Sequence, residues 1–261
     1  MKSASTRRGP KTPDGLDQVY GVHALQSLLD RGEAPRELWV QQGAGSRLKE
    51  LVAHAQSHGA RVKEQPRDLL DQLTQGAAHQ GVVAFCPPLT PEGEESLWLK
   101  LRAWSSNTPP LLLILDGVTD VHNFGACLRS ADAAGAHGVI VAKDKAAPLN
   151  ATVRKVACGA AEVVPVYQVT NLARTLAKLK DAGVWITGTA GEAEASVFDI
   201  DMTGPTALVM GAEGKGMRRL TREACDNLAK LPMAGEVSSL NVSVATGICL
   251  FEAVRQRQLA S

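Results

Sequence analysis

From Leu111 onward, continuous apolar segments alternate with stretches typical of helices, and this alternation constrains the fold more than any other feature. A strand that is buried on both faces has a continuous apolar sequence, and parallel strands require crossover connections, which are usually helices. The sequence therefore predicts an α/β domain with a mostly parallel sheet covered on both faces. The expected strands are 111–118, 138–142, 162–167, 184–190, 207–213 and 227–233, and a long final helix is expected over roughly 240–258.

A smaller unit precedes this region. Residues 19–88 combine helix-like segments such as VHALQSLLD with strand-like segments such as ELWVQ and GVVAFC, which predicts a small α/β domain. Residues 1–18 are rich in Lys, Arg, Pro, Ser and Gly and predict a disordered basic tail. Residues 89–108 predict a linker with one helical turn in its middle, and residues 109–261 predict the second domain.

Composition and charge exclude several classes of protein. The formal net charge is +1, so a surface that binds nucleic acid would have to be a local patch. The five cysteines are scattered without a C-x-x-C pair, which argues against a disulfide framework or a metal site and fits a reducing cytoplasm. No apolar run approaches the roughly eighteen residues that a membrane helix needs, and no apolar stretch follows the basic N-terminus as in a secretory signal. The expected class is a bacterial cytoplasmic protein that contacts no membrane.

Unusual residues gather after three of the expected strands. DGVTDVHNFGACLRSADAAG follows the strand at 111, MGAEGKGM covers residues 210–217, and LPMAGEVSSLNVSVATG covers residues 231–247. In an open parallel sheet, ligands bind where loops leave the carboxyl ends of the strands. These segments are therefore the candidate site.

Each segment also has an ordinary structural interpretation. The glycines of GAEGKG serve either tight turns or a ligand, and the loop matches neither a P-loop nor a dinucleotide fingerprint. Arg129 is a surface arginine by base rate, but its neighbours are small and apolar, which predicts a buried cation that needs an anionic partner. Ser238 or Ser239 alone would cap the final helix, whereas the further polar residues at 241 and 243 indicate a site as well.

At these segments the chain closely resembles the SpoU (TrmH-type) branch of the SPOUT RNA methyltransferases. The resemblance rests on Asn123-Phe-Gly125 with Arg129, on MGAEGKGM and on PMAGEVSSLNVSVA. It extends into the N-terminal unit, where YGVHALQSLL and HQGVVA resemble an L30e-like RNA-binding domain. Nearly the whole chain from about residue 19 is covered.

The resemblance implies an activity, a cofactor and an architecture. The activity is methylation of the ribose 2′-hydroxyl of a guanosine in 23S rRNA, in the peptidyl-transferase P-loop region, during ribosome biogenesis. The methyl donor would be S-adenosylmethionine, bound within a deep C-terminal trefoil knot of a homodimer. Base rates alone would reject a knot, so this expectation depends wholly on the family. The cofactor would contact Thr189, Ala190, Gly211, Leu231, Met233 and Leu240, largely through backbone groups.

The resemblance also implies the catalytic residues. They are Arg129, Asn123, Glu213, Ser239 and Asn241, and Arg129 of one subunit would lie near the cofactor of the other. Family proposals make Arg129 the group that activates the 2′-hydroxyl, but an arginine rarely gives up its proton. We therefore expect Arg129 to act as a cation that stabilises the developing alkoxide. Glu213 is an alternative base.

Basic residues beside these segments predict contacts with RNA phosphate groups, although a solvated helix face is the commoner explanation for any single charge. The predicted RNA-binding residues are Lys143, Lys145, Arg154, Lys155, Lys215 and Arg218, with Arg219 and Arg222 nearby. His122 would either stack on a base or cap a turn.

Two other functions would fit an α/β protein with a Gly-rich loop less well. A dinucleotide-dependent dehydrogenase would need a G-x-G-x-x-G fingerprint after the strand at 111, and GVTDVHNFG does not supply it. A ribosome-assembly factor that kept the fold and lost catalysis would not need the polar residues of all three segments.

Overall fold

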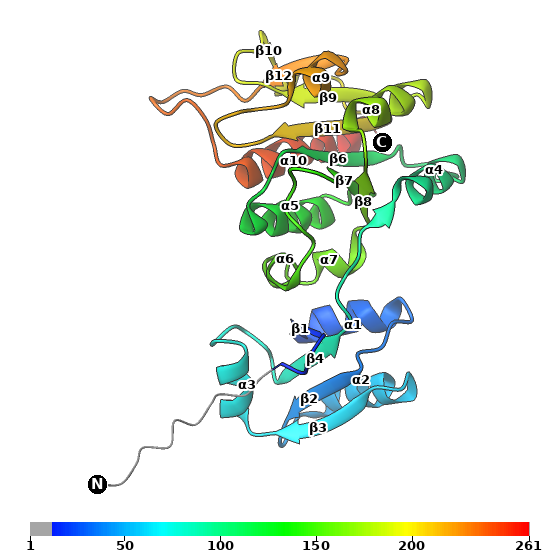
Figure 1. Ribbon diagram of the computed structural model, residues 1–261, viewed down its shortest axis with the longest axis vertical. Coiled ribbons are helices and arrows are strands. Elements are labelled where there is room, and N and C mark those ends of the chain that lie inside the picture. Colours follow the sequence, from blue (N-terminus) through cyan, green and yellow to red (C-terminus); the bar gives the residue numbers. More distant parts are fainter. Residues whose placement is uncertain (1–11, 261) are drawn as a thin grey trace. The chain divides into compact units, whose positions relative to one another are not determined.

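The computed structural model describes residues 12–260, which form two compact units, one up to Leu89 and the other from Thr90 (Figure 1). The prediction of a disordered basic tail falls mostly on residues 1–11, which lie outside the described part. Within the range assigned to the tail, Asp17 and Gln18 already belong to the first strand. No helix among the described residues is long and apolar enough to cross a membrane.

The N-terminal unit is a four-stranded mixed sheet with the order β1-β4-β2-β3. β2 and β3 are parallel, whereas β4 is antiparallel to both of its neighbours. The strands are β1 (Asp17–Tyr20), β2 (Glu37–Gln41), β3 (Arg61–Gln65) and β4 (Val82–Cys86), and the helices are α1 (Val22–Asp30), α2 (Ser46–Ser57) and α3 (Arg67–Leu73). The expected elements of this unit are thus present, and β1 was not predicted.

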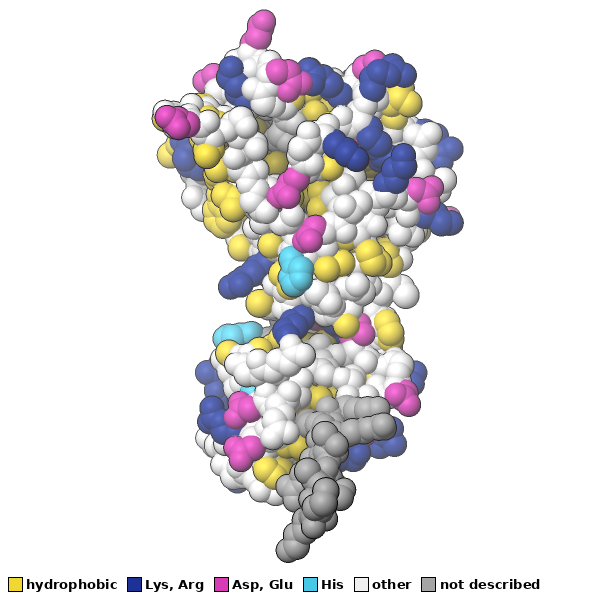
Figure 2. Space-filling model, turned by 60° about the vertical axis from the view of Figure 1, so that its left-hand side comes forward, with side chains coloured by type: hydrophobic (Ala, Val, Ile, Leu, Met, Phe, Trp, Pro, Cys, Tyr) yellow, Lys and Arg dark blue, Asp and Glu magenta, His cyan; other side chains and the backbone are white. Residues whose placement is uncertain are grey.

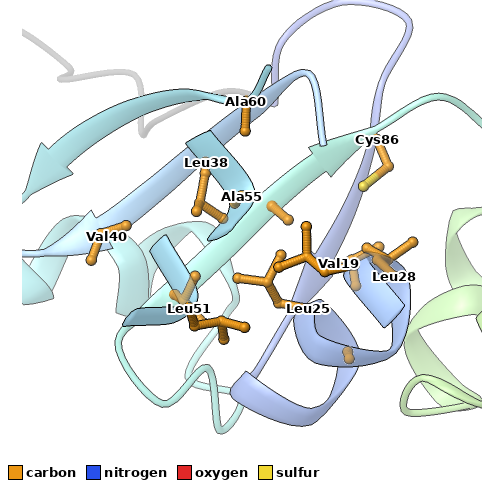
Figure 3. Close-up of a cluster of buried hydrophobic side chains, with 13 residues drawn as sticks. Val19, Leu25, Leu28, Leu38, Val40, Leu51, Ala55, Ala60 and Cys86 are labelled. Carbon is orange, nitrogen blue, oxygen red and sulfur yellow. The ribbon is translucent and has the colours of Figure 1, made fainter. Parts of the chain in front are cut away.

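The core of this unit lies between the sheet and the helices α1 and α2. Leu25 and Leu28 on α1 meet Leu38 on β2 and Leu51 on α2 (Figure 3). The apolar positions of α1 are three or four residues apart, so they share one helix face and are buried together.

The YG and HQG motifs of this unit hold one another. Gly21 has a φ of 97° and precedes α1, which has no cap from its own N-terminal residue. The Gln80 side chain takes over that role, because its Oε1 accepts a hydrogen bond from the Val22 backbone N–H at 2.8 Å. His79 is buried and bonds Asp71 through Nε2 at 2.8 Å. The residues that carry the resemblance here therefore also hold the unit together.

The second unit is built on an eight-stranded sheet with the order β10-β12-β9-β11-β6-β7-β8-β5, in which all pairs are parallel. The strands are β5 (Glu92–Gly93), β6 (Leu111–Asp116), β7 (Gly138–Ala142), β8 (Val166–Val169), β9 (Trp185–Thr189), β10 (Ala195–Ser196), β11 (Thr206–Gly211) and β12 (Asn227–Lys230). The parallel sheet expected from the apolar segments is confirmed.

Helices cover both faces of this sheet (Figure 1). They are α4 (Glu94–Arg102), α5 (Val121–Ala133), α6 (Ala151–Val156), α7 (Ala160–Val163), α8 (Leu172–Asp181), α9 (Arg219–Glu223) and α10 (Val242–Ala260), with a short 3-10 helix η1 (Val197–Asp199). On one face, Leu97 of α4 and Leu176 of α8 pack on Ile114 and Val209 of the central strands. On the other face, α5 and α10 pack against one another.

Two segments differ from their expected structure. The expected strand over 162–167 begins as helix α7, and the strand starts only at Val166. Residues 89–108 were expected to be a linker, yet they contain β5, which joins the large sheet, and the nine-residue helix α4. Leu97 is only 1% exposed in the core of the second unit, so this segment packs as part of that unit.

Candidate active site

Three loops meet at the carboxyl edge of the large sheet because β11 lies between β6 and β9, and β12 pairs with β9. The loop after β6 leads into α5, where Asp120 caps the helix by accepting a hydrogen bond from Asn123 N at 2.8 Å. The loop after β11 contains Glu213, and the loop after β12 leads to Asn241 just before α10. Parallel pairing therefore brings together residues more than a hundred positions apart in the sequence.

A hydrogen-bonded cluster joins the three loops. Asn241 Nδ2 donates to Glu213 Oε1 at 2.7 Å and to Asn123 Oδ1 at 2.9 Å. Asn123 Nδ2 and the Val242 backbone N–H also donate to Glu213 Oε1, both at 3.3 Å. Three of the five predicted catalytic residues are thus in direct contact. Glu213 Oε2 accepts no hydrogen bond in the described part of the chain.

A cavity of about 790 Å³ lies beside this cluster. Its walls come from the ends of β9 and β11, the Gly-rich loop and residues 230–242. The walls include all six residues predicted to bind the cofactor: Thr189, Ala190, Gly211, Leu231, Met233 and Leu240. Glu213, Ser239 and Asn241 line the same cavity, so the predicted cofactor residues and three of the five predicted catalytic residues face one space.

The Gly-rich loop is folded tightly on itself. Ala212 and Gly216 exchange two backbone hydrogen bonds, of 3.1 and 2.8 Å. A Cβ added to Gly211 would lie 2.3 Å from Gly216 C and from Met217 N, so only glycine fits under this turn. Glycine is therefore required at position 211 because the backbone of residues 216 and 217 in the same loop packs directly against it.

Asp116 anchors the end of this loop and was not singled out from the sequence. Its carboxylate is fully buried and accepts hydrogen bonds from Arg218 N at 2.8 Å and from Arg218 Nε at 2.5 Å. A buried carboxylate requires such partners because burial without them is costly. The signal was present in the sequence, since Asp116 ends the apolar strand LLLILD.

A second cavity, of about 440 Å³, lies against the same loop. Asn123, Glu213 and Lys215 line it, together with Asp116 to Asp120 and Lys145. Glu213 and Lys215 also line the larger cavity, so these two residues belong to the walls of both.

Arg129 does not have the predicted environment. Its side chain is exposed, and it donates a hydrogen bond from Nη1 to Cys158 Sγ at 3.7 Å rather than to an anion. The expectation of a buried cation was wrong, because the small apolar residues around it, such as Cys127 and Leu128, occupy the buried face of α5 and Arg129 does not. The structure does not bring Arg129 into the cluster of Asn123, Glu213 and Asn241.

The basic residues predicted to bind RNA fall into different environments. Lys143, Lys145, Lys155 and Lys215 are exposed. Arg154 corrects the prediction, because its side chain is only 3% exposed and forms an ion pair with the buried Glu162. Arg218 is also exposed but pairs with Asp116, and Arg219 and Arg222 pair with Glu223 and Glu192. Lys and Arg side chains stand in groups with Asp and Glu among them on the face shown in Figure 2.

The cysteines near the site are suited to packing rather than to nucleophilic chemistry. Burial raises the pKa of the Cys127 thiol to about 11, although a hydrogen bond with Thr246 opposes this shift. Burial also raises the pKa of the Cys225 thiol to about 11, with a contribution from the nearby Asp226. Both thiols are therefore neutral near pH 7. No group of three metal-ligating side chains occurs in residues 12–260.

Three motif loops thus meet at the carboxyl edge of a parallel sheet, beside a cavity lined by the Gly-rich loop. This is the arrangement expected of an RNA methyltransferase of the SPOUT type. Residues 110–251 match the model of the SpoU rRNA methylase family, and the chain belongs to that family. Residues 18–92 match a model described as RNA 2′-O ribose methyltransferase substrate binding.

Characterised relatives and solved structures resemble nearly the whole chain. The 23S rRNA (guanosine-2′-O-)-methyltransferase RlmB of Pseudomonas putida is 58% identical over 94% of this chain and 98% of its own length. RlmB of Escherichia coli K12 is 56% identical over 92% of this chain and 99% of its own length. The SpoU methyltransferase AviRb from Streptomyces viridochromogenes, solved in complex with AdoMet, aligns with a TM-score of 0.74 at 27% identity, over 94% of this chain and 92% of that one.

Proposed function

We propose that this protein transfers a methyl group from S-adenosylmethionine to the ribose 2′-hydroxyl of a guanosine in 23S rRNA. One observation carries the proposal: Glu213 and Asn241 line the 790 Å³ cavity and are hydrogen-bonded, and Asn241 is also hydrogen-bonded to Asn123 in the wall of the neighbouring cavity. The identity of more than 55% to RlmB enzymes over nearly the whole chain supports the choice of substrate. By the same resemblance, the target guanosine lies in the peptidyl-transferase P-loop region, the modification belongs to ribosome biogenesis, and the protein acts in the cytoplasm.

The cavity suits the proposed cofactor in size and chemistry. Ligand pockets usually measure about 300–1,000 Å³ and combine apolar walls with a few polar groups. Leu231, Met233 and Leu240 supply apolar surface, and the segment after Thr189 and the Gly-rich loop supply backbone groups. Bound S-adenosylmethionine would supply a methyl group attached to a sulfonium, so the protein has to provide orientation and charge.

The polar cluster orients the groups that would meet the ribose. Glu213 Oε1 accepts three N–H hydrogen bonds, which fixes the carboxylate and leaves Oε2 as the oxygen able to accept a hydrogen bond from a hydroxyl. Asn123 and Asn241 hold Glu213, and Ser239 adds a hydroxyl on the cavity wall. Glu213 remains an alternative general base, and Arg129 is assigned the stabilisation of the developing alkoxide.

Arg129 requires a partner subunit to perform this role. In one chain its exposed side chain is not part of the cluster, and the family pattern places it at the cofactor of the other subunit. An apolar stripe supports a dimer through α10, because Val244 and Phe251 are 51% and 49% exposed and Phe198 of the adjoining η1 is 49% exposed. Exposed apolar patches of this kind mark interaction surfaces.

We also assign a trefoil knot to residues 109–261 by resemblance. Its support is the chain path, in which β12 pairs at the far side of β9 while α10 returns to pack on α5, the helix that follows the central strand β6. Residues 19–88 are assigned as an L30e-like domain for RNA recognition, and the matching substrate-binding model supports that role. Lys143, Lys145, Lys155, Lys215 and the exposed part of Arg218 are proposed to contact phosphates, whereas Arg154 is buried and does not belong to that set.

The proposal is tested with 23S rRNA isolated from a strain that lacks the gene. Purified protein and S-adenosylmethionine should introduce one 2′-O-methylguanosine, mapped by its resistance to alkaline hydrolysis. Calorimetry should show binding of S-adenosylmethionine to the protein alone. Asn241→Ala should lose most activity, because it releases both Glu213 and Asn123. Lys63→Ala is the control, because Lys63 lines neither of the two cavities. Methylation of a base, or of a different RNA, would contradict the assignment.

A further inference from the structure

The turn between α6 and α7 lies beside the exposed Arg129 side chain. Cys158 in this turn has a φ of 52°, and its Sγ accepts the hydrogen bond from Arg129 Nη1 at 3.7 Å. The same thiol donates a hydrogen bond from Sγ to the Lys155 backbone carbonyl at 3.7 Å. The proton is thus directed toward the carbonyl, and the sulfur lone pairs are left to accept from the guanidinium.

A buried ion pair fixes this turn. Arg154 on α6 and Glu162 on α7 are 3% and 0% exposed at their side chains. They form a two-bond contact, with Arg154 Nε 2.5 Å from Glu162 Oε1 and Nη2 3.0 Å from Oε2. Such a paired geometry gives directional specificity as well as energy. The ion pair therefore links α6 to α7 across the turn that contains Cys158.

Close packing of α5 against α6 sets the turn relative to Arg129. A Cβ added to Gly125 of α5 would lie 2.7 Å from Val156 Cβ and 2.9 Å from the Val153 carbonyl oxygen, so glycine is required at this contact. Since Arg129 extends from the next turn of the same helix, the Cys158 thiol has a defined position relative to its guanidinium.

Because the partner of Arg129 is a neutral thiol, no negative charge compensates the positive charge of its guanidinium. Across residues 12–260, no carboxylate forms an ion pair with Arg129, whereas Arg154, Arg218, Arg219 and Arg222 each have one. Sulfur is a weak acceptor, and a carboxylate in its place would make a stronger, charge-assisted bond. We propose that Cys158 is a positioning residue for Arg129, which orients the guanidinium while leaving its positive charge available to the reacting ribose oxygen. This inference rests on the proposed function.

The test compares Cys158→Asp with Cys158→Asn. Asn and Asp both tolerate a positive φ and have nearly the same shape, so the two variants differ mainly by one negative charge. The Asn variant should keep a kcat for rRNA methylation close to that of the wild type. In the Asp variant kcat should fall by about fivefold, the effect of a partly exposed ion pair. The ratio between the two variants should approach one at high ionic strength, because salt screens an exposed charge pair.

Binding of S-adenosylmethionine should be unchanged in both variants, and Val163→Ala on the neighbouring α7 serves as a control for surface changes. Equal kcat values for the Asp and Asn variants, with an active wild type, would overturn the inference alone. A loss of cofactor binding in the Asp variant would also overturn it, because the residue would then support the fold. A wild-type protein that transfers no methyl group to 23S rRNA would overturn the proposed function and, with it, this role.

Discussion

Replacement of Gly211 by Ala should disable the cavity by forcing the Gly-rich loop away from its strand. The added Cβ would lie 2.3 Å from Gly216 C and Met217 N and 2.8 Å from Gly216 Cα, all of them backbone atoms. Optimal carbon contacts are about 3.5–4.0 Å, so the loop would have to retreat by roughly 1 Å or more. A displacement of about 1 Å near a reacting centre costs on the order of 100-fold in rate. Overpacking of this kind also costs about 1–3 kcal/mol of stability.

The assay measures S-adenosylmethionine affinity, methylation rate and the free energy of unfolding without cofactor. All three should fall in Gly211→Ala, and Gly211→Val should abolish cofactor binding. Gly204→Ala is the matched control, because its added Cβ meets no atom within 4 Å and Gly204 does not line the cavity. Normal stability combined with lost cofactor binding would refute the reasoning, since the clash would then be with the ligand and not with the loop. Unchanged affinity would show that the pocket is elsewhere.

Further predictions concern Arg129, the boundary between the units and the half-buried His137. Arg129→Ala should bind S-adenosylmethionine normally in calorimetry while methyl transfer falls by roughly 10²–10³, and Arg129→Lys should not restore full activity because it lacks the planar guanidinium; wild-type turnover would refute the role. A chain that begins at Thr90 should fold and bind S-adenosylmethionine, its measured mass should be that of a dimer, and it should methylate rRNA poorly. A chain that begins at Pro109 should unfold at a lower denaturant concentration, because it lacks the buried Leu97. Site-specific methylation by the shorter chains at the full rate would exclude RNA recognition by the N-terminal unit. Burial, with nearby Arg257 and Lys100, lowers the pKa of His137 from 6.5, so the folded state binds this proton less well than the unfolded state. Stability should therefore decrease as the pH falls through about 6.5, and His137→Asn, which can still accept from the Leu111 N–H, should show a smaller decrease in denaturant titrations at several pH values.

The sequence by itself determined the sheet and the composition of the site. Continuous apolar segments such as 111–115 can be buried only between two layers, so they predict a covered parallel sheet without any knowledge of the fold. The ends of those strands carry Asn123, Glu213 and Asn241, and the rule that ligands bind at carboxyl ends was sufficient to group them. The N-terminal elements were also legible, because their apolar residues recur at helical or strand spacing.

The local sequence pattern could not predict the structure of segments whose composition fits two kinds of element equally well. The segment at 162–167 contains a helical turn before its strand, and a short apolar run does not distinguish a buried helix from a strand. The linker likewise became part of the second unit because Leu97 finds a core formed by strands far along the chain. These outcomes depend on long-range packing, which no short window of sequence contains.

Only the tertiary structure decided what each charged side chain does. Arg154 and Arg129 both stand among small apolar residues in the sequence, yet Arg154 is buried on Glu162 and Arg129 is exposed beside Cys158. The difference arises because the orientation of a helix about its axis, fixed by contacts such as Gly125 on Val156, sets which residues face the core. The sequence determined which chemical groups are available. The packing of the helices decided which of them stabilise the fold and which remain exposed to RNA and cofactor.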